Sequence, residues 1–186
     1  RRVARWRSAV AGEGLESGER VAIRLRNGLD WVSFDLAVLA EGLVSVPLYI
    51  EDRPDNIAYI LDDAAVKLLL LQNLAQWKKL QPSLRGNKTL QRVVILDAPS
   101  ADQEKAAALA DDQRLRFVDD WLPATAADMQ RRQGDPHGLA SIVYTSGTTG
   151  RPKGVMLSHF NMLSVAHAAV ASVDCYVGEV DRKAHV

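Results

Sequence analysis

The chain is organised around one stretch, Ile142-Val143-Tyr144-Thr145-Ser146-Gly147-Thr148-Thr149-Gly150-Arg151-Pro152-Lys153-Gly154-Val155. An apolar run suited to a buried strand ends in a segment rich in Ser, Thr and Gly with one lysine, and apolar residues resume at 155–157. Glycine lets the backbone approach a ligand, hydroxyl and free N–H groups donate hydrogen bonds, and lysine supplies positive charge. The stretch therefore predicts a loop that binds a polyanion such as a triphosphate.

The loop differs from the Walker A loop, G-x-x-x-x-G-K-[ST], which binds phosphate at the start of a helix. Its glycines have another spacing, and Pro152 with Gly154 before an apolar run indicates an extended exit. A P-loop kinase or GTPase is therefore disfavoured, and anions must be bound by the loop's own hydroxyls, amides and Lys153. A polar hairpin without a ligand is the alternative, but the density of Ser, Thr, Gly and Lys favours binding.

The remaining apolar runs predict an α/β fold with a doubly wound, mostly parallel sheet. Strands that are apolar throughout indicate a sheet covered by helices on both faces. The runs are 21–25, 43–46, 66–71, 92–96 and 115–118. Periodicity and capping residues predict helices at 1–15, 27–42, 54–64, around Trp77, weakly at 98–111, at 119–122 and at 158–173.

Several residues are placed to define helix ends. Asn27 and Asp30 have the spacing of a capping box, and Gly42 suits the C′ position of the same helix. Ser158 is placed to cap the helix after the loop. The apolar positions of that last helix share one face and are Leu163, Ala166, Val170 and Val173.

The composition is that of an ordinary globular chain, with 186 residues, 47% hydrophobic and 25% charged. Lys+Arg and Asp+Glu both number 23, so no net charge attracts the chain to nucleic acid. A lone cysteine, Cys175, fits a reducing compartment, and no run approaches the roughly 20 apolar residues of a membrane helix. We expect a cytoplasmic protein, with peripheral membrane contact and oligomeric state left open. Its ends, Arg1 and Val186, suggest a piece of a larger protein.

Other candidate sites are weak. His159 and His167 lack the i, i+4 spacing of a helical zinc pair, so no metal site is predicted. Ser146 does not lie in a G-x-S-x-G elbow, which argues against a hydrolase nucleophile. Adjacent aspartates, as in Asp62-Asp63, are interpreted as solvated caps rather than acid/base pairs.

The stretch from Tyr144 to Val155 resembles the phosphate-loop signature of the adenylate-forming (AMP-binding) enzymes, which include acyl-CoA synthetases, firefly luciferase and peptide-synthetase adenylation domains. Residues 18–31 and 40–49 are similar to the first strand, helix and strand of that family. Residues 156–161 resemble the segment after the loop in fatty acyl-CoA synthetases. The resemblance implies part of the family's large domain, divided as 1–15 leading helix, 16–138 α/β subdomain, 139–157 strand-loop-strand and 158–173 following helix, without the C-terminal lid domain.

The resemblance implies an acid-thiol ligase that activates a carboxylic acid, expected to be a long-chain fatty acid, as an acyl-AMP and passes the acyl group to coenzyme A. ATP phosphates, with Mg²⁺ sharing their charge, would be held by Thr145, Ser146, Gly147, Thr148, Thr149, Gly150 and Lys153. The family's adenine, hinge and catalytic-lysine motifs lie beyond the equivalent of Val186, so no catalytic residue is assigned and the chain alone is expected to be inactive. An amino- or aryl-acid adenylating domain and a non-catalytic nucleotide- or partner-binding module remain alternatives.

Overall fold

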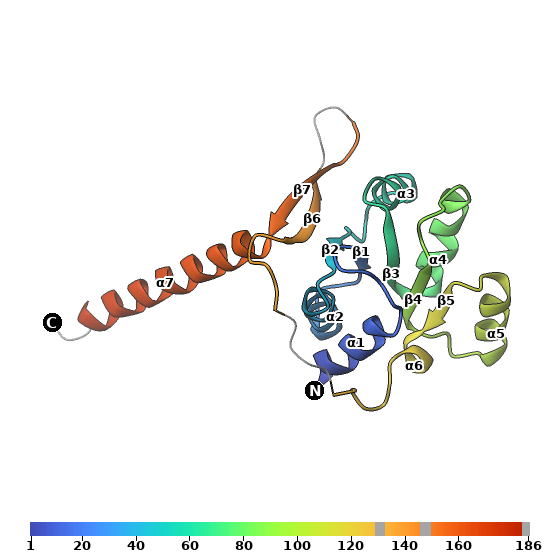
Figure 1. Ribbon diagram of the computed structural model, residues 1–186, viewed down its shortest axis with the longest axis horizontal. Helices are drawn as coiled ribbons and strands as arrows, with labels where there is room; N and C mark the ends of the chain where they lie inside the picture. Colours follow the sequence, from blue (N-terminus) through green and yellow to red (C-terminus); the bar gives the residue numbers. More distant parts are fainter. Residues whose placement is uncertain (129–132, 146–149, 184–186) are drawn as a thin grey trace.

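The computed structural model describes residues 1–128, 133–145 and 150–183, and side chains up to Ala171 (Figure 1). The strands are β1 (Arg20–Arg24), β2 (Val44–Pro47), β3 (Val66–Asn73), β4 (Arg92–Asp97), β5 (Leu115–Phe117), β6 (Leu139–Thr145) and β7 (Lys153–Ser158). The helices are α1 (Arg2–Ala11), α2 (Leu29–Ala40), α3 (Pro54–Asp63), α4 (Leu74–Leu80), α5 (Asp102–Asp111), α6 (Val118–Trp121) and α7 (His159–Lys183), with a 3-10 turn at Gln81–Leu84.

The seven strands form one sheet in the order β5-β4-β3-β1-β2-β6-β7. Neighbouring strands are parallel except β6 and β7, which form an antiparallel hairpin. Helices connect the parallel strands, as short crossovers within one sheet require. The predicted doubly wound, mostly parallel α/β fold is confirmed.

The apolar run of β3 shows why the sheet needs cover on both faces. Leu68 and Leu70 pack into a cluster with Trp6 of α1 and Phe34 of α2, whereas Leu69 and Leu71 pack into a second cluster under α3 and α4. Successive side chains of a strand point to opposite faces. The run therefore supplies two cores at once, and all four leucines are fully buried.

The predicted capping box of the second helix is wrong. Gly28, in extended backbone with φ 171°, is the N-cap residue, and α2 begins at Leu29 without a side-chain capping bond. Asp30 instead pairs with Arg2 of α1 at 3.0 Å. The helix starts later than expected because the extended glycine separates Asn27 from the first turn.

Two other predicted helix ends are confirmed. Gly42 follows the C-cap residue of α2 with φ +73°, a conformation that favours glycine. At the start of α7, the Ser158 hydroxyl accepts a bond from the Asn161 amide at 3.2 Å, and the Asn161 side chain accepts one from the Ser158 amide at 2.9 Å. This reciprocal pair ends β7 and begins the helix within one residue.

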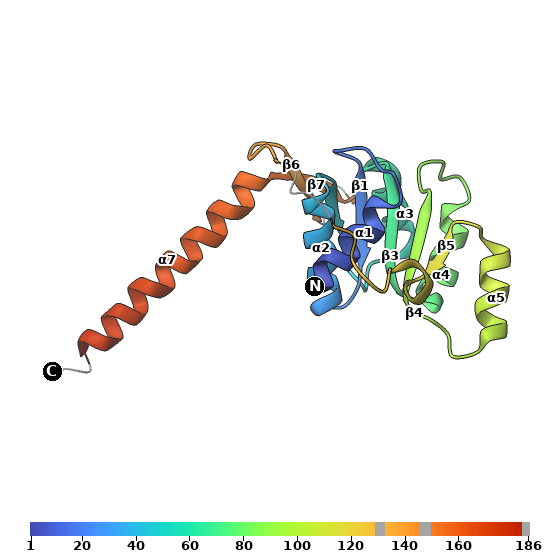
Figure 2. The same cartoon turned by 60° about the horizontal axis from the view of Figure 1, so that its bottom comes forward.

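Helix α7 continues past the predicted end at 173 to Lys183 and projects away from the sheet in both views (Figures 1 and 2). Its predicted apolar face is exposed: Leu163 retains 66% and Val170 63% of their accessible surface. Ala166 is also exposed, and the side chain of Val173 lies outside the described ones. Within the described part of the chain, no helix is long and apolar enough to cross a membrane.

Asp35 on α2 gives stability a pH dependence. Its partly buried carboxylate accepts a bond from the Ser45 hydroxyl at 2.6 Å. Burial raises the pKa of Asp35, and the Ser45 bond only partly opposes this. The Asp35 carboxyl therefore binds its proton more tightly in the folded state than in the unfolded state. The free energy of unfolding should fall as the pH rises from the unfolded pKa, about 3.9, through the higher folded pKa, because the proton is lost over that range.

Asp35→Asn should therefore raise the urea midpoint of unfolding at pH 7 and have little effect near pH 3, since Asn keeps an acceptor for Ser45 and removes the charge. Asp97→Asn is the matched control, because exposed Asp97 also accepts one neutral bond, from Gln72 at 2.7 Å. A lower midpoint for Asp35→Asn at pH 7 would contradict this account.

Gly154 in β7 lies opposite Tyr144 in β6. A Cβ atom there would lie 2.8 Å from Ile142 Cγ2 and 3.1 Å from Tyr144 Cζ, closer than packed atoms tolerate. Gly154→Ala should lower the free energy of unfolding by about 1–3 kcal/mol, measured by urea titration. Gly86→Ala is the control, because nothing lies within 4 Å of its Cβ position. An equal loss of stability in Gly154→Ala and Gly86→Ala would show that the close approach of Ile142 and Tyr144 to position 154 does not destabilise the variant.

Candidate functional site

The candidate site lies at the carboxyl end of β6, beside the start of α3. In open α/β sheets, ligands bind at the carboxyl ends of the parallel strands, and β6 runs parallel to β2. A hollow of about 650 Å³ opens there. It is lined by Tyr49, Glu51, Asp52, Asn56, Ile60, Tyr144, Thr145, Gly150, Arg151 and Pro152.

Tyr144 fixes the end of β6. Its ring is buried, with 4% exposure, and its hydroxyl donates a bond to Asp63 Oδ2 at 2.6 Å. Burial and then the Asp63 carboxylate raise the pKa of Tyr144 well above its usual value, so the phenol keeps its proton at neutral pH. The next residue, Thr145, is exposed at the mouth of the hollow.

The chain returns from the loop through Gly150, Arg151 and Pro152. Gly150 has φ +89°, and the Arg151 guanidinium lies over the Tyr59 ring of α3, 5.3 Å from its centroid. Lys153 then begins β7 in register with Thr145. The lysine is exposed and forms no ion pair with any described residue.

Three of the predicted phosphate-binding residues are therefore described and lie together. Thr145 and Lys153 pair across the first rung of the hairpin, and Thr145 and Gly150 line the hollow. The other four predicted residues lie outside the described residues and are Ser146, Gly147, Thr148 and Thr149. The Thr145 hydroxyl and the Lys153 ammonium group, on paired residues of the hairpin, can bind an anion, whereas they provide no activated nucleophile.

The far wall of the hollow is the segment 49–52, which leads into α3. Arg24 holds this segment by donating to the Ile50 carbonyl at 2.6 Å and the Asp52 carbonyl at 3.3 Å. Burial lowers the pKa of Arg24, while Asp52 and Glu51 raise it. Asp52 in turn accepts a bond from Asn56 at 2.8 Å in the first turn of α3.

Sequence reasoning missed the role of α3 in the site. Asp63 was predicted to be a solvated cap, but it accepts the Tyr144 hydroxyl, and its neighbour Asp62 accepts a bond from Asn87. The two adjacent carboxylates thus bind different partners, Asp63 the Tyr144 hydroxyl and Asp62 the Asn87 amide. Only their partners, distant in the chain, could not be identified from local spacing.

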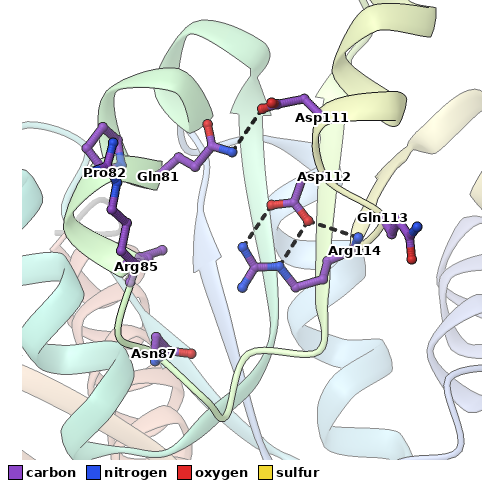
Figure 3. Close-up of a pocket in the computed structure, with 9 residues that line it drawn as sticks. Gln81, Pro82, Arg85, Asn87, Asp111, Asp112, Gln113 and Arg114 are labelled. Carbon is purple, nitrogen blue, oxygen red and sulfur yellow. Dashed lines mark hydrogen bonds and ion pairs between the residues drawn. The ribbon is translucent and has the colours of Figure 1, made fainter.

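A second hollow, of about 470 Å³, lies before the amino ends of β4 and β5, at the edge of the sheet that β5 forms. Figure 3 shows the residues that line it. Its polar side chains hydrogen-bond to one another. The Arg114 guanidinium donates two bonds to Asp112, at 3.0 and 2.8 Å, and Gln81 donates to Asp111 at 3.1 Å. The bonds from Arg114 lower the pKa of Asp112. We therefore interpret this hollow as a structural junction between α4 and β5.

Comparison with known proteins identifies relatives of the whole chain. The family model described as AMP-binding enzyme matches residues 1–184. Fatty acyl-CoA synthetase A of Dictyostelium discoideum is 31% identical over 92% of this chain and 29% of its own length. Gramicidin S synthase 2 of Aneurinibacillus migulanus is 31% identical over 84% of this chain and 3% of its own length.

A solved structure also resembles the chain over most of its length. The ATP-bound MatB structure from Rhodopseudomonas palustris is 26% identical, with a TM-score of 0.68, over 91% of this chain and 30% of the MatB chain. The chain thus spans less than a third of the length of these relatives. Because the family model covers almost every residue, including the strand-loop-strand at the site, the chain belongs to the family of AMP-binding, adenylate-forming enzymes.

Proposed function

We propose that this chain is part of the large domain of an ATP-dependent acyl-CoA synthetase. The complete enzyme activates a carboxylic acid as acyl-AMP, releases pyrophosphate and transfers the acyl group to coenzyme A. The observation that carries the proposal is that Thr145, which lines an open hollow, pairs across the hairpin with Lys153, within the stretch that resembles the family's phosphate loop. We propose that the chain divides into a leading helix at 1–15, an α/β subdomain at 16–138, the strand-loop-strand at 139–157 and the following helix at 158–173.

The proposed role of the loop is to hold the β- and γ-phosphates while pyrophosphate leaves. Donors placed where charge develops stabilise a transition state without forming a covalent bond. The residues assigned to this role are Thr145, Ser146, Gly147, Thr148, Thr149, Gly150 and Lys153. Mg²⁺ arrives with ATP as part of the substrate, and the described residues contain no cluster of three or more His, Cys, Asp or Glu suited to a metal ion.

The proposed acid is a long-chain fatty acid. Support comes from the 31% identity to a fatty acyl-CoA synthetase and from the resemblance of residues 156–161 to that group. An amino or aryl acid is the alternative, because gramicidin S synthase 2 is also 31% identical to this chain. A non-catalytic nucleotide- or partner-binding module is the alternative from another class. The apolar α7 face fits burial against further parts of a larger enzyme.

The complete product of the gene should catalyse acid-dependent ATP–pyrophosphate exchange, with the highest rate on fatty acids in a panel of fatty, aryl and amino acids. Lys153→Ala and Thr145→Ala should each lower that rate about 10²-fold or more, because each removes a donor to the leaving phosphates. Lys88→Ala, at another exposed lysine, is the charge-matched control. Rates within a few-fold of wild type for both site variants would refute the assignment.

The chain of 186 residues alone should show no pyrophosphate exchange and at most weak ATP binding by calorimetry. The reason is that the family's adenine-binding and catalytic-lysine motifs have no counterpart among these residues. Exchange by this chain with any carboxylic acid would show that the hollow at β6 suffices for the chemistry.

A further inference from the structure

Both flanks of the loop contact the same helix, α3. On the entry side, the Tyr144 hydroxyl donates to Asp63 Oδ2 at 2.6 Å. On the exit side, the Arg151 guanidinium lies over the Tyr59 ring. Tyr59 and Asp63 are one helical turn apart, and the Tyr59 hydroxyl contacts Asp63 Oδ1 at 3.4 Å. One carboxylate thus connects the residues that hold the two flanks.

The geometry of the hairpin makes this connection specific. Tyr144 lies opposite Gly154, and the absence of a side chain at Gly154 leaves the space that the Tyr144 ring occupies on its way to α3. The phenol is buried in the cluster beneath α3 and stays protonated at neutral pH, so it is a permanent donor to Asp63.

Helix α3 is fixed in position by packing against the sheet and by hydrogen bonds at its first turn. Its Ile57 and Leu61 are fully buried against the sheet. Its first turn is fixed through Asn56, which donates to Asp52, while Arg24 of β1 holds the backbone of the same segment. A group on α3 therefore keeps a constant position relative to the carboxyl ends of β1 and β2.

We propose that Asp63 is a positioning residue, which acts through Tyr144 and Tyr59 to hold the two flanks of the loop against α3, so that Thr145 and Lys153, already paired across the hairpin, keep a fixed position for one phosphate chain. This inference rests on the proposed function. Ordering the flanks before ATP arrives reduces the conformational entropy lost on binding. Loss of Asp63 should therefore weaken ATP binding more than it slows the chemical step.

The test compares variants that change this connection with one that leaves it intact. Asp63→Ala removes the acceptor, Tyr144→Phe removes the donor, and Asp63→Asn keeps a neutral acceptor for the Tyr144 hydroxyl. Asp62→Ala is the control, because it removes the neighbouring carboxylate of α3, which binds Asn87 rather than the hairpin.

Hydrogen–deuterium exchange of the 186-residue chain measures the connection without any activity. Amides of residues 139–145 and 150–158 should exchange roughly ten- to a hundredfold faster in Asp63→Ala and Tyr144→Phe, as expected for loss of one bond to a charged group. The exchange rates of amides in β1 and β3 should be unchanged, and Asp63→Asn should restore much of the protection of the hairpin. A double variant that combines Asp63→Ala with Tyr144→Phe should exchange as fast as each single variant. Unchanged hairpin exchange, or an equal effect of Asp62→Ala, would overturn the proposal.

Pyrophosphate exchange by the complete gene product measures the consequence for ATP. Asp63→Ala should raise KM for ATP roughly tenfold with a smaller change in kcat and no change in KM for the acid, and Asp63→Asn should recover most of the loss. An equal fall of kcat with KM unchanged would overturn the positioning role. A wild-type protein without exchange would refute the proposed function, while hydrogen exchange would still decide whether Asp63 holds the hairpin.

Discussion

The site depends on a change of direction at one edge of the sheet. β6 is the last strand to join the parallel set, and β7 folds back on it as an antiparallel partner. This reversal places the loop at the carboxyl edge, where the parallel strands leave room for a ligand, and it brings Thr145 and Lys153 opposite each other. A crossover helix after β6 would have put these residues on different layers.

The rest of the fold keeps that hairpin in place. The leucines of β3 contribute to two cores, so the sheet is held from both faces by α1 and α2 on one side and α3 and α4 on the other. Tyr144 extends the second core to the hairpin and ends in a bond to α3. Packing and polar contacts therefore converge at the flanks of the loop.

Local sequence patterns predicted the strands, the two-faced sheet, the extended exit at Pro152 and the cap at Ser158, because each is decided by neighbouring residues. The cap at Asn27 failed since the extended Gly28 moved the helix start, which spacing alone does not reveal. The bond between Tyr144 and Asp63 joins residues 81 positions apart, so only the packed sheet brings them together. The sequence of α7 predicted that its apolar residues share one face. The spacing of these residues does not identify the surface that they pack against, and Leu163 and Val170 are exposed here.

We propose that the loop between β6 and β7 binds the phosphates of ATP. An acyl-phosphate derivative of ATP tests it directly, because a lysine beside the terminal phosphate attacks the acyl carbon, forms an amide and releases ATP. Mass spectrometry of the labelled, complete gene product should find the acyl group on Lys153, with labelling suppressed by excess ATP. Labelling confined to other lysines, with Lys153 unmodified, would show that the ATP phosphates do not lie beside Lys153.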